Sequence, residues 1–128
     1  MDNKRDYQVI ISNCTRELSP KERVAIKDLT DTVSLGELKE GEEIIIHPDF
    51  SALLEIHNEH SENKDYKVFV IVDKDGKRYA TSSESLMSSY DNIADEMSDY
   101  PDEDYAVKVY TKPSKNYKGK AFLTCSIV

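Results

Sequence analysis

Lysines and aromatic residues alternate with small apolar residues in two segments of the sequence, residues 67–73 and 105–112. Successive side chains of an extended strand point to opposite faces, so Lys67 and Phe69 share one face and the valines of the same segment share the other. In the later segment Lys108, Tyr110 and Lys112 likewise lie opposite valines. We expect the valine-rich faces to form the core, which leaves lysines and aromatic rings on an outward face.

A face of this composition has the chemistry that binds single-stranded nucleic acid. Lysines neutralise phosphates, and each ring that stacks on a base contributes about 1–3 kcal/mol. If the two strands are neighbours, further basic and aromatic residues join them. The predicted nucleic-acid-binding residues are Lys67, Phe69, Arg78, Tyr79, Lys108, Tyr110, Lys112, Lys115, Tyr117, Lys118 and Lys120. The plainer alternative is that Phe69 packs beneath a helix and that the tyrosines only cover the surface of a sheet.

The charge of the chain indicates a second class of function as the alternative. The 128 residues carry a net charge of −8, but residues 84–105 hold eight acidic and no basic side chains, whereas residues 106–128 hold five lysines and no acidic side chain. Clustered carboxylates can imitate the phosphates of nucleic acid and bind a basic groove. The alternative is therefore an acidic phage-type inhibitor that binds a host protein such as a nuclease through Asp91, Asp95, Glu96, Asp99, Asp102, Glu103 and Asp104.

The sequence has no recognisable catalytic motif. It contains neither a phosphate-binding glycine loop, nor a nucleophile elbow, nor the paired histidines of a zinc protease. Cys14 and Cys125 lie in strand-like segments, where thiols usually pack in the core. The motif His57-x-x-His60 has no fixed partners to complete a zinc site, and the aspartates before Gly76 suit a hairpin turn better than a calcium loop. We expect a non-enzymatic protein without metal or cofactor.

Patterning along the chain predicts one α+β domain over residues 1–128, with two helices and a mainly antiparallel, OB-like or open sheet of about six to seven strands. One helix starts at Ser19 and Pro20, and a second follows a capping box that begins at Thr81. The segments 42–47 and 51–57 are expected to form a hairpin. The apolar runs are too short to cross a membrane and no leader is recognised, which favours the cytoplasm.

The order of features in residues 66–128 resembles small single-stranded DNA-binding proteins of phages and mobile elements of Gram-positive bacteria. The resemblance consists of a strand, an Asp-Gly hairpin, the segment 78–86 (RYATSSESL) leading into a helix, and the stretch 112–120 (KPSKNYKGK) before the closing strand. It implies an OB-like fold, single-stranded DNA as partner, and a role in replication or recombination in the cytoplasm of a bacterial host cell. Many such proteins end in an acidic tail, whereas the acidic block is internal here.

Overall fold

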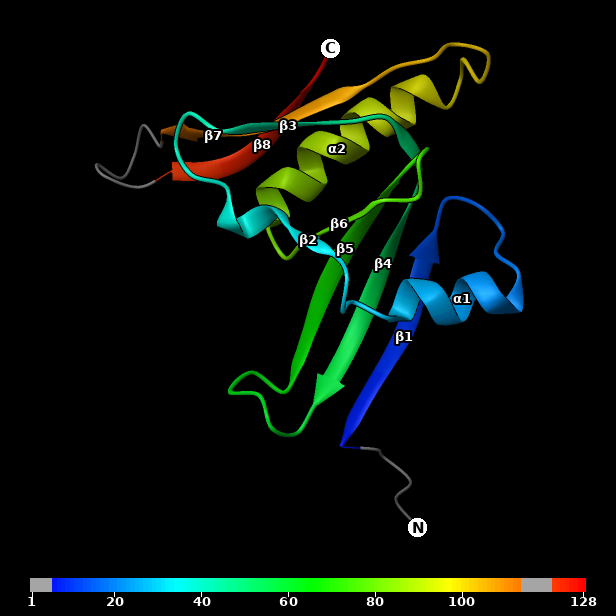
Figure 1. Ribbon diagram of the computed structural model, residues 1–128, viewed down its shortest axis with the longest axis vertical. Helices are drawn as coiled ribbons and strands as arrows, with labels where there is room; N and C mark the ends of the chain where they lie inside the picture. The colour runs from blue at the N-terminus through cyan, green and yellow to red at the C-terminus, as the bar shows by residue number, and fades with distance from the viewer. Residues whose placement is uncertain (1–5, 114–120) are drawn as a thin grey trace.

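The computed structural model describes residues 6–113 and 121–128, which form eight strands and two α-helices. The fold is α+β with mainly antiparallel strands, as the sequence predicts, and among the described strands only β2 and β6 pair in parallel. The strands divide into two sheets. In Figure 1 the strands of the smaller sheet run across the top of the molecule, above one end of the long strands of the larger sheet.

The larger sheet, here called sheet A, has five strands. The turn that joins β4 to β5 lies at the end of the molecule remote from the smaller sheet (Figure 1). Across the sheet the order is β1 (Tyr7–Cys14), β4 (Pro48–Asn58), β5 (Asp65–Asp73), β6 (Arg78–Thr81) and β2 (Val33–Ser34). A short 3-10 helix, η1 (Leu35–Glu37), follows β2 directly.

The smaller sheet, sheet B, has three antiparallel strands in the order β3 (Glu43–Ile46), β7 (Val107–Pro113) and β8 (Ala121–Ile127). The predicted hairpin of 42–47 with 51–57 is wrong, because β3 belongs to sheet B and β4 to sheet A. Only His47 separates these two strands, and a hairpin needs a loop of at least two residues. Two hydrogen bonds fix the backbone of His47, where the chain turns from one sheet into the other. Its N–H donates to Asp73 Oδ2 (2.9 Å), and its carbonyl accepts from Lys74 N–H (2.9 Å).

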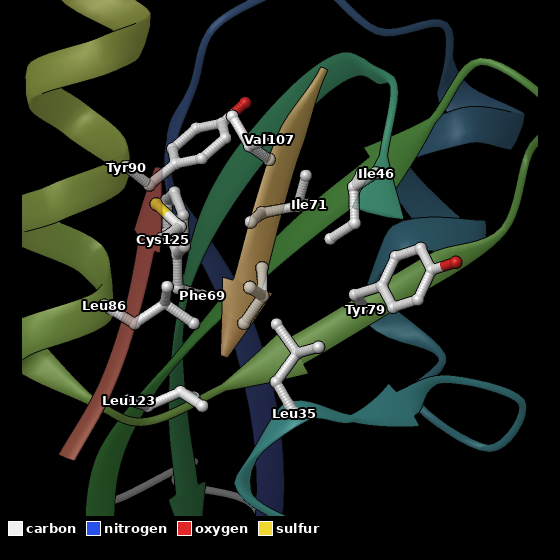
Figure 2. Close-up of a cluster of buried hydrophobic side chains, with 11 residues drawn as sticks. Leu35, Ile46, Phe69, Ile71, Tyr79, Leu86, Tyr90, Val107, Leu123 and Cys125 are labelled. Atoms are coloured by element: carbon white, nitrogen blue, oxygen red, sulfur yellow. The ribbon is translucent and has the colours of Figure 1, made fainter. Parts of the chain in front are cut away.

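Two hydrophobic clusters cover the two faces of sheet A. The first lies between sheets A and B and the second α-helix, and includes Phe69, Ile71, Leu86, Tyr90 and Val107 (Figure 2). The second lies on the other face of sheet A beneath the first α-helix and includes Leu54, Val68 and Val70. Strand β5 therefore has buried side chains on both of its faces.

The two helices are held at their starts by serine side chains. Helix α1 (Pro20–Lys27) has the predicted capping box, with Ser19 Oγ accepting from Glu22 N–H. Helix α2 (Glu84–Met97) is capped by Ser83, which accepts from Leu86 N–H, and the predicted cap at Thr81 is wrong. Thr81 Oγ1 instead accepts from Ser83 N–H (3.0 Å), one step earlier in the turn. Neither α-helix is long and apolar enough to span a membrane, within the residues described.

Candidate nucleic-acid interface

Sheet B has one face on the hydrophobic core and one face directed to solvent. On β7, Val107 and Val109 point inward and are fully buried. Lys108 and Tyr110 are partly exposed and Lys112 is exposed, because they alternate with the buried residues. The predicted division of this strand into a valine face and a lysine–tyrosine face is confirmed.

Strand β8 brings a second aromatic ring to the same outer face. Cross-strand register pairs Tyr110 with Thr124 and Lys112 with Phe122. Tyr110 and Phe122 are therefore diagonal neighbours, a relation that places residues roughly 7–8 Å apart on one face of a sheet. The side chain of Phe122 is 39% exposed. Phe122 is not among the binding residues predicted from the sequence. In β8 it alternates with the buried Leu123 and Cys125, so the same two-residue period identifies it as an outward residue.

Polar contacts fix the position of the Tyr110 ring. Its hydroxyl forms a hydrogen bond with Ser126 Oγ on β8 (2.9 Å), which ties the ring across the two strands. Lys108 Nζ lies 5.3 Å from the ring centroid, within range of a cation–π contact, and 3.8 Å from Glu43 Oε2 on β3. The ring is thus held in place before any ligand arrives, which lowers the entropic cost of stacking on it.

Two predicted binding residues, Phe69 and Tyr79, belong instead to the core between the sheets. Each is only 6% exposed. The ring of Phe69 packs edge-on against Tyr90 of α2, with 5.4 Å between the centroids. The outward placement predicted for these two rings is wrong, because α2 and sheet B cover the face of sheet A on which both lie. The plainer alternative for Phe69, packing beneath a helix, is the one observed.

Lys67 and Arg78 also lie away from the outer face of sheet B. Lys67 is exposed on sheet A, opposite Glu55, close to the β4–β5 turn. The guanidinium of Arg78 donates hydrogen bonds to the carbonyl oxygens of Ala25 and Asp28 (2.8 Å for Asp28) at the end of α1, on the other side of sheet A. The structure therefore does not gather the predicted residues of sheet A with those of β7.

A family model for phage single-stranded DNA-binding proteins matches residues 21–128. The chain belongs to this family. The match extends the resemblance seen in residues 66–128 and includes all of sheet B, whereas β1 lies before the matched residues. No curated protein and no solved structure matches the chain.

Four of the predicted binding residues lie outside the described part of this member of the family. They are Lys115, Tyr117, Lys118 and Lys120, which the sequence places between β7 and β8. Among the described residues, the outer face of sheet B carries Lys108, Tyr110, Lys112 and Phe122. We call these four residues the stacking face.

The acidic residues of the alternative function lie on α2 and on the segment that follows it. A cleft of about 500 Å³ is lined by Asp91, Asp95, Glu103 and Asp104 together with Tyr90 and other side chains. Glu96, Asp99 and Asp102 do not line this cleft, so the seven carboxylates do not form one continuous row in it. Burial, with the nearby charge of Asp95, raises the pKa of Asp91 above its usual range.

Asp104 at the cleft has a basic partner. Lys74 Nζ forms an ion pair with its carboxylate, and this contact holds the pKa of Asp104 below its usual range and raises that of Lys74. The negative potential of the cleft is therefore partly compensated from the β5–β6 turn.

Two of the residues considered for catalysis or metal binding, Cys125 and His57, occupy structural positions. Cys125 is buried, and burial raises the pKa of its thiol to about 11, so the thiol stays protonated near neutral pH. His57 is also buried, and its two ring nitrogens each lie 2.7 Å from a carboxylate oxygen, of Asp65 and Glu59. Within the described ranges, no group of three or more candidate ligands is arranged to hold a metal ion.

Proposed function

We propose that this protein binds single-stranded DNA on the stacking face and serves the replication or recombination of a phage or mobile element. The observation that carries the proposal is that two partly exposed rings, Tyr110 and Phe122, lie on one face of sheet B beside Lys108 and Lys112. Membership of a phage single-stranded DNA-binding family supports the choice of ligand. The protein would act without catalysis, by covering DNA strands in stoichiometric amounts.

The arrangement suggests how a strand of DNA is held. Bases stack on Tyr110 and Phe122, whose diagonal positions allow each ring to receive one base. The ammonium groups of Lys108 and Lys112 neutralise phosphates, and the lysines at 115, 118 and 120 are proposed to extend this positive charge along the backbone. Stacking needs no particular base, so we expect binding with little sequence preference.

The direct test is fluorescence anisotropy of labelled oligo-dT, titrated with protein at low and at physiological salt. We expect binding that weakens steeply as salt rises, because lysine–phosphate contacts release counterions. Binding should also be tighter than to a duplex of the same length, since paired bases cannot stack on the rings. No binding to oligo-dT at low salt, where electrostatic attraction is least screened, would overturn the proposal.

Two single substitutions locate the site. Tyr110→Ala and Phe122→Ala should each weaken oligo-dT binding about 5- to 150-fold, the equivalent of one lost stacking contact of about 1–3 kcal/mol. Tyr100→Ala is the matched control, because Tyr100 is an exposed tyrosine outside the stacking face. Circular dichroism of each variant checks that the fold is kept. If the three variants bind DNA alike, the stacking face is not the site.

The acidic cleft beside α2 supports a second candidate function, the inhibitor of a host protein, and the oligo-dT titration also distinguishes this function from DNA binding. Asp91, Asp95 and Glu103 gather around this cleft, an arrangement that suits a basic surface on a host protein. If oligo-dT does not bind, the inhibitor function takes precedence. Its own test replaces the cleft residues Asp91 and Asp95 by asparagine and Glu103 by glutamine. Binding of a host nuclease that survives this triple change would rule the inhibitor function out.

A further inference from the structure

Strand β1 forms an edge of sheet A, and no other described strand pairs with its outer side. The remaining three sheet edges are each short or covered. Strand β2 has two residues and β3 has four. Along β8 lies α2, with Ser85 Oγ donating to the Leu123 carbonyl (2.8 Å) and the hydroxyls of Ser89 and Thr124 bonded at 3.0 Å. Strand β1 differs from these three edges, because it has eight residues and its outer side is unpaired. Open edges of this length are normally blocked in proteins.

The backbone groups that β1 presents outward follow from its pairing with β4. Glu59 N–H donates to the Asp6 carbonyl, so Asp6 belongs to a hydrogen-bonded pair. Hydrogen-bonded residues alternate along an antiparallel pair, and Gln8 and Ile10 therefore also bond to β4. The N–H and C=O groups of Tyr7, Val9 and Ile11 must then point away from sheet A.

The side chains of β1 favour association rather than preventing it. Tyr7 is 51% exposed on the side of the strand that carries α1, next to the exposed Val24. Ile10 is 49% exposed on the opposite side. Residues 7–14 include no charged side chain and no proline, which are two of the devices that block an edge strand. A third device, a β-bulge, lies between Ile11 and Asn13, after the residues whose backbone groups point outward.

We propose that β1 pairs with β1 of a second copy of this chain, antiparallel about a two-fold axis at Val9. In this register Val9 faces Val9 of the other copy, and Tyr7 faces Ile11 of the other copy. All outward backbone groups of these three residues then find partners, and the two five-stranded sheets continue into one. Because residues 7–14 are uncharged, the two paired strands place no like charges opposite each other.

The size of the contact sets the expected strength of the dimer. One pair of short strands with two flanking apolar side chains buries less than the roughly 1,200–2,000 Å² of a stable interface. We therefore expect a dimer that dissociates on dilution. Sheet B is not part of the pairing, so the stacking face of each copy stays free, and the proposal holds or fails independently of DNA binding.

The decisive measurement is amide hydrogen exchange without DNA at low and high protein concentration. We expect the amides of Tyr7, Val9 and Ile11 to gain protection as concentration rises, while those of Gln8 and Ile10 are protected throughout by β4. Light scattering should show the average mass rising from 14.6 kDa toward twice that value over the same range. A mass that stays monomeric, or a dimer without this alternating protection, would overturn the proposal.

Two variants test the edge directly. Tyr7→Pro removes an outward N–H and no bond to β4, and Ile10→Lys places a charge beside the pairing edge. Both should keep the chain monomeric at concentrations where the unchanged protein dimerises. Ile127→Lys is the control, because Ile127 is equally exposed (51%) but lies on β8, and it should leave the dimer intact. Circular dichroism shows that each variant is folded, and a dimer that persists in folded Ile10→Lys contradicts the pairing.

Discussion

Strands β5 and β7 are both inner strands that carry a lysine and an aromatic residue two positions apart, but one ring is buried and the other is partly exposed. Phe69 of β5 lies in the core, since sheet A has hydrophobic clusters on both faces. Tyr110 of β7 is partly exposed, because sheet B is covered on one face only. The difference shows that the exposure of a ring depends on whether other layers pack on both faces of its sheet or on one. The alternation of residue types within its own strand does not decide this.

The sharpest test of this comparison is to remove each ring in turn. Phe69→Ala should lower the free energy of unfolding by about 3–5 kcal/mol, because it leaves a cavity beside Tyr90. Tyr110→Ala should cost far less, mainly one hydrogen bond worth about 1 kcal/mol. Urea denaturation followed by circular dichroism measures both. Equal losses of stability would mean that the two strands are not buried as differently as described.

Arg78 is a cation with a structural role, in contrast to the lysines of the stacking face. Its guanidinium bonds to carbonyl oxygens at the end of α1, so Arg78→Ala should lower the free energy of unfolding by about 1.5 kcal/mol, the low end for charged hydrogen bonds because the site is partly exposed. Oligo-dT affinity should stay unchanged. Arg23→Ala, an exposed arginine on α1, serves as the control for general loss of charge. If DNA affinity falls in Arg78→Ala but not in Arg23→Ala, Arg78 belongs to the DNA-binding surface.

The sequence was sufficient for β7 because alternation is informative where only one face is buried. Val107 and Val109 faced inward as predicted, and Lys108, Tyr110 and Lys112 faced outward. The same period also holds in β8, where extending it by one strand would have identified Phe122.

Alternation was misleading for β5 because residues 68–72 form an unbroken apolar run. Such a run is typical of a strand buried on both faces, so the sequence did contain a warning. What it could not supply was the division into two sheets. That depends on pairings between distant segments, such as β3 with β7, and on the corner at His47, where a single residue redirects the chain.

A smaller effect is expected from exchanging the lysines of the two strands for glutamate. Lys112→Glu should weaken oligo-dT binding and reduce the slope of log affinity against log salt by about 1, because one phosphate contact is lost. Lys67→Glu is the matched variant on β5, and should leave both the affinity and the slope unchanged. Anisotropy titrations at several salt concentrations measure the slopes. Equal reductions in both variants would place Lys67 on the DNA path and would require a binding surface that includes both sheets.

The smallest effect concerns Glu59, at the end of sheet A remote from the stacking face. Its carboxylate contacts His57 Nε2 (2.7 Å) and Lys64 Nζ (3.2 Å), and these hydrogen bonds, that to His57 first, hold the pKa of Glu59 below its usual value of 4.5. A depressed pKa in the folded state means that unfolding takes up protons in acid. The stabilisation is therefore fully present above the usual pKa and is lost as the pH falls through the folded value.

Glu59→Gln removes this ionisation while keeping the shape of the side chain. The unchanged protein should lose more stability between about pH 6 and about pH 3 than Glu59→Gln does, as measured by urea midpoints at the two values. Oligo-dT affinity at neutral pH should be the same in both, because the β4–β5 turn lies far from sheet B. If both proteins lose equal stability, the contacts of Glu59 do not contribute in solution. If affinity falls as well, the two ends of sheet A are not independent, and the separation between a structural sheet and a binding sheet fails at that point.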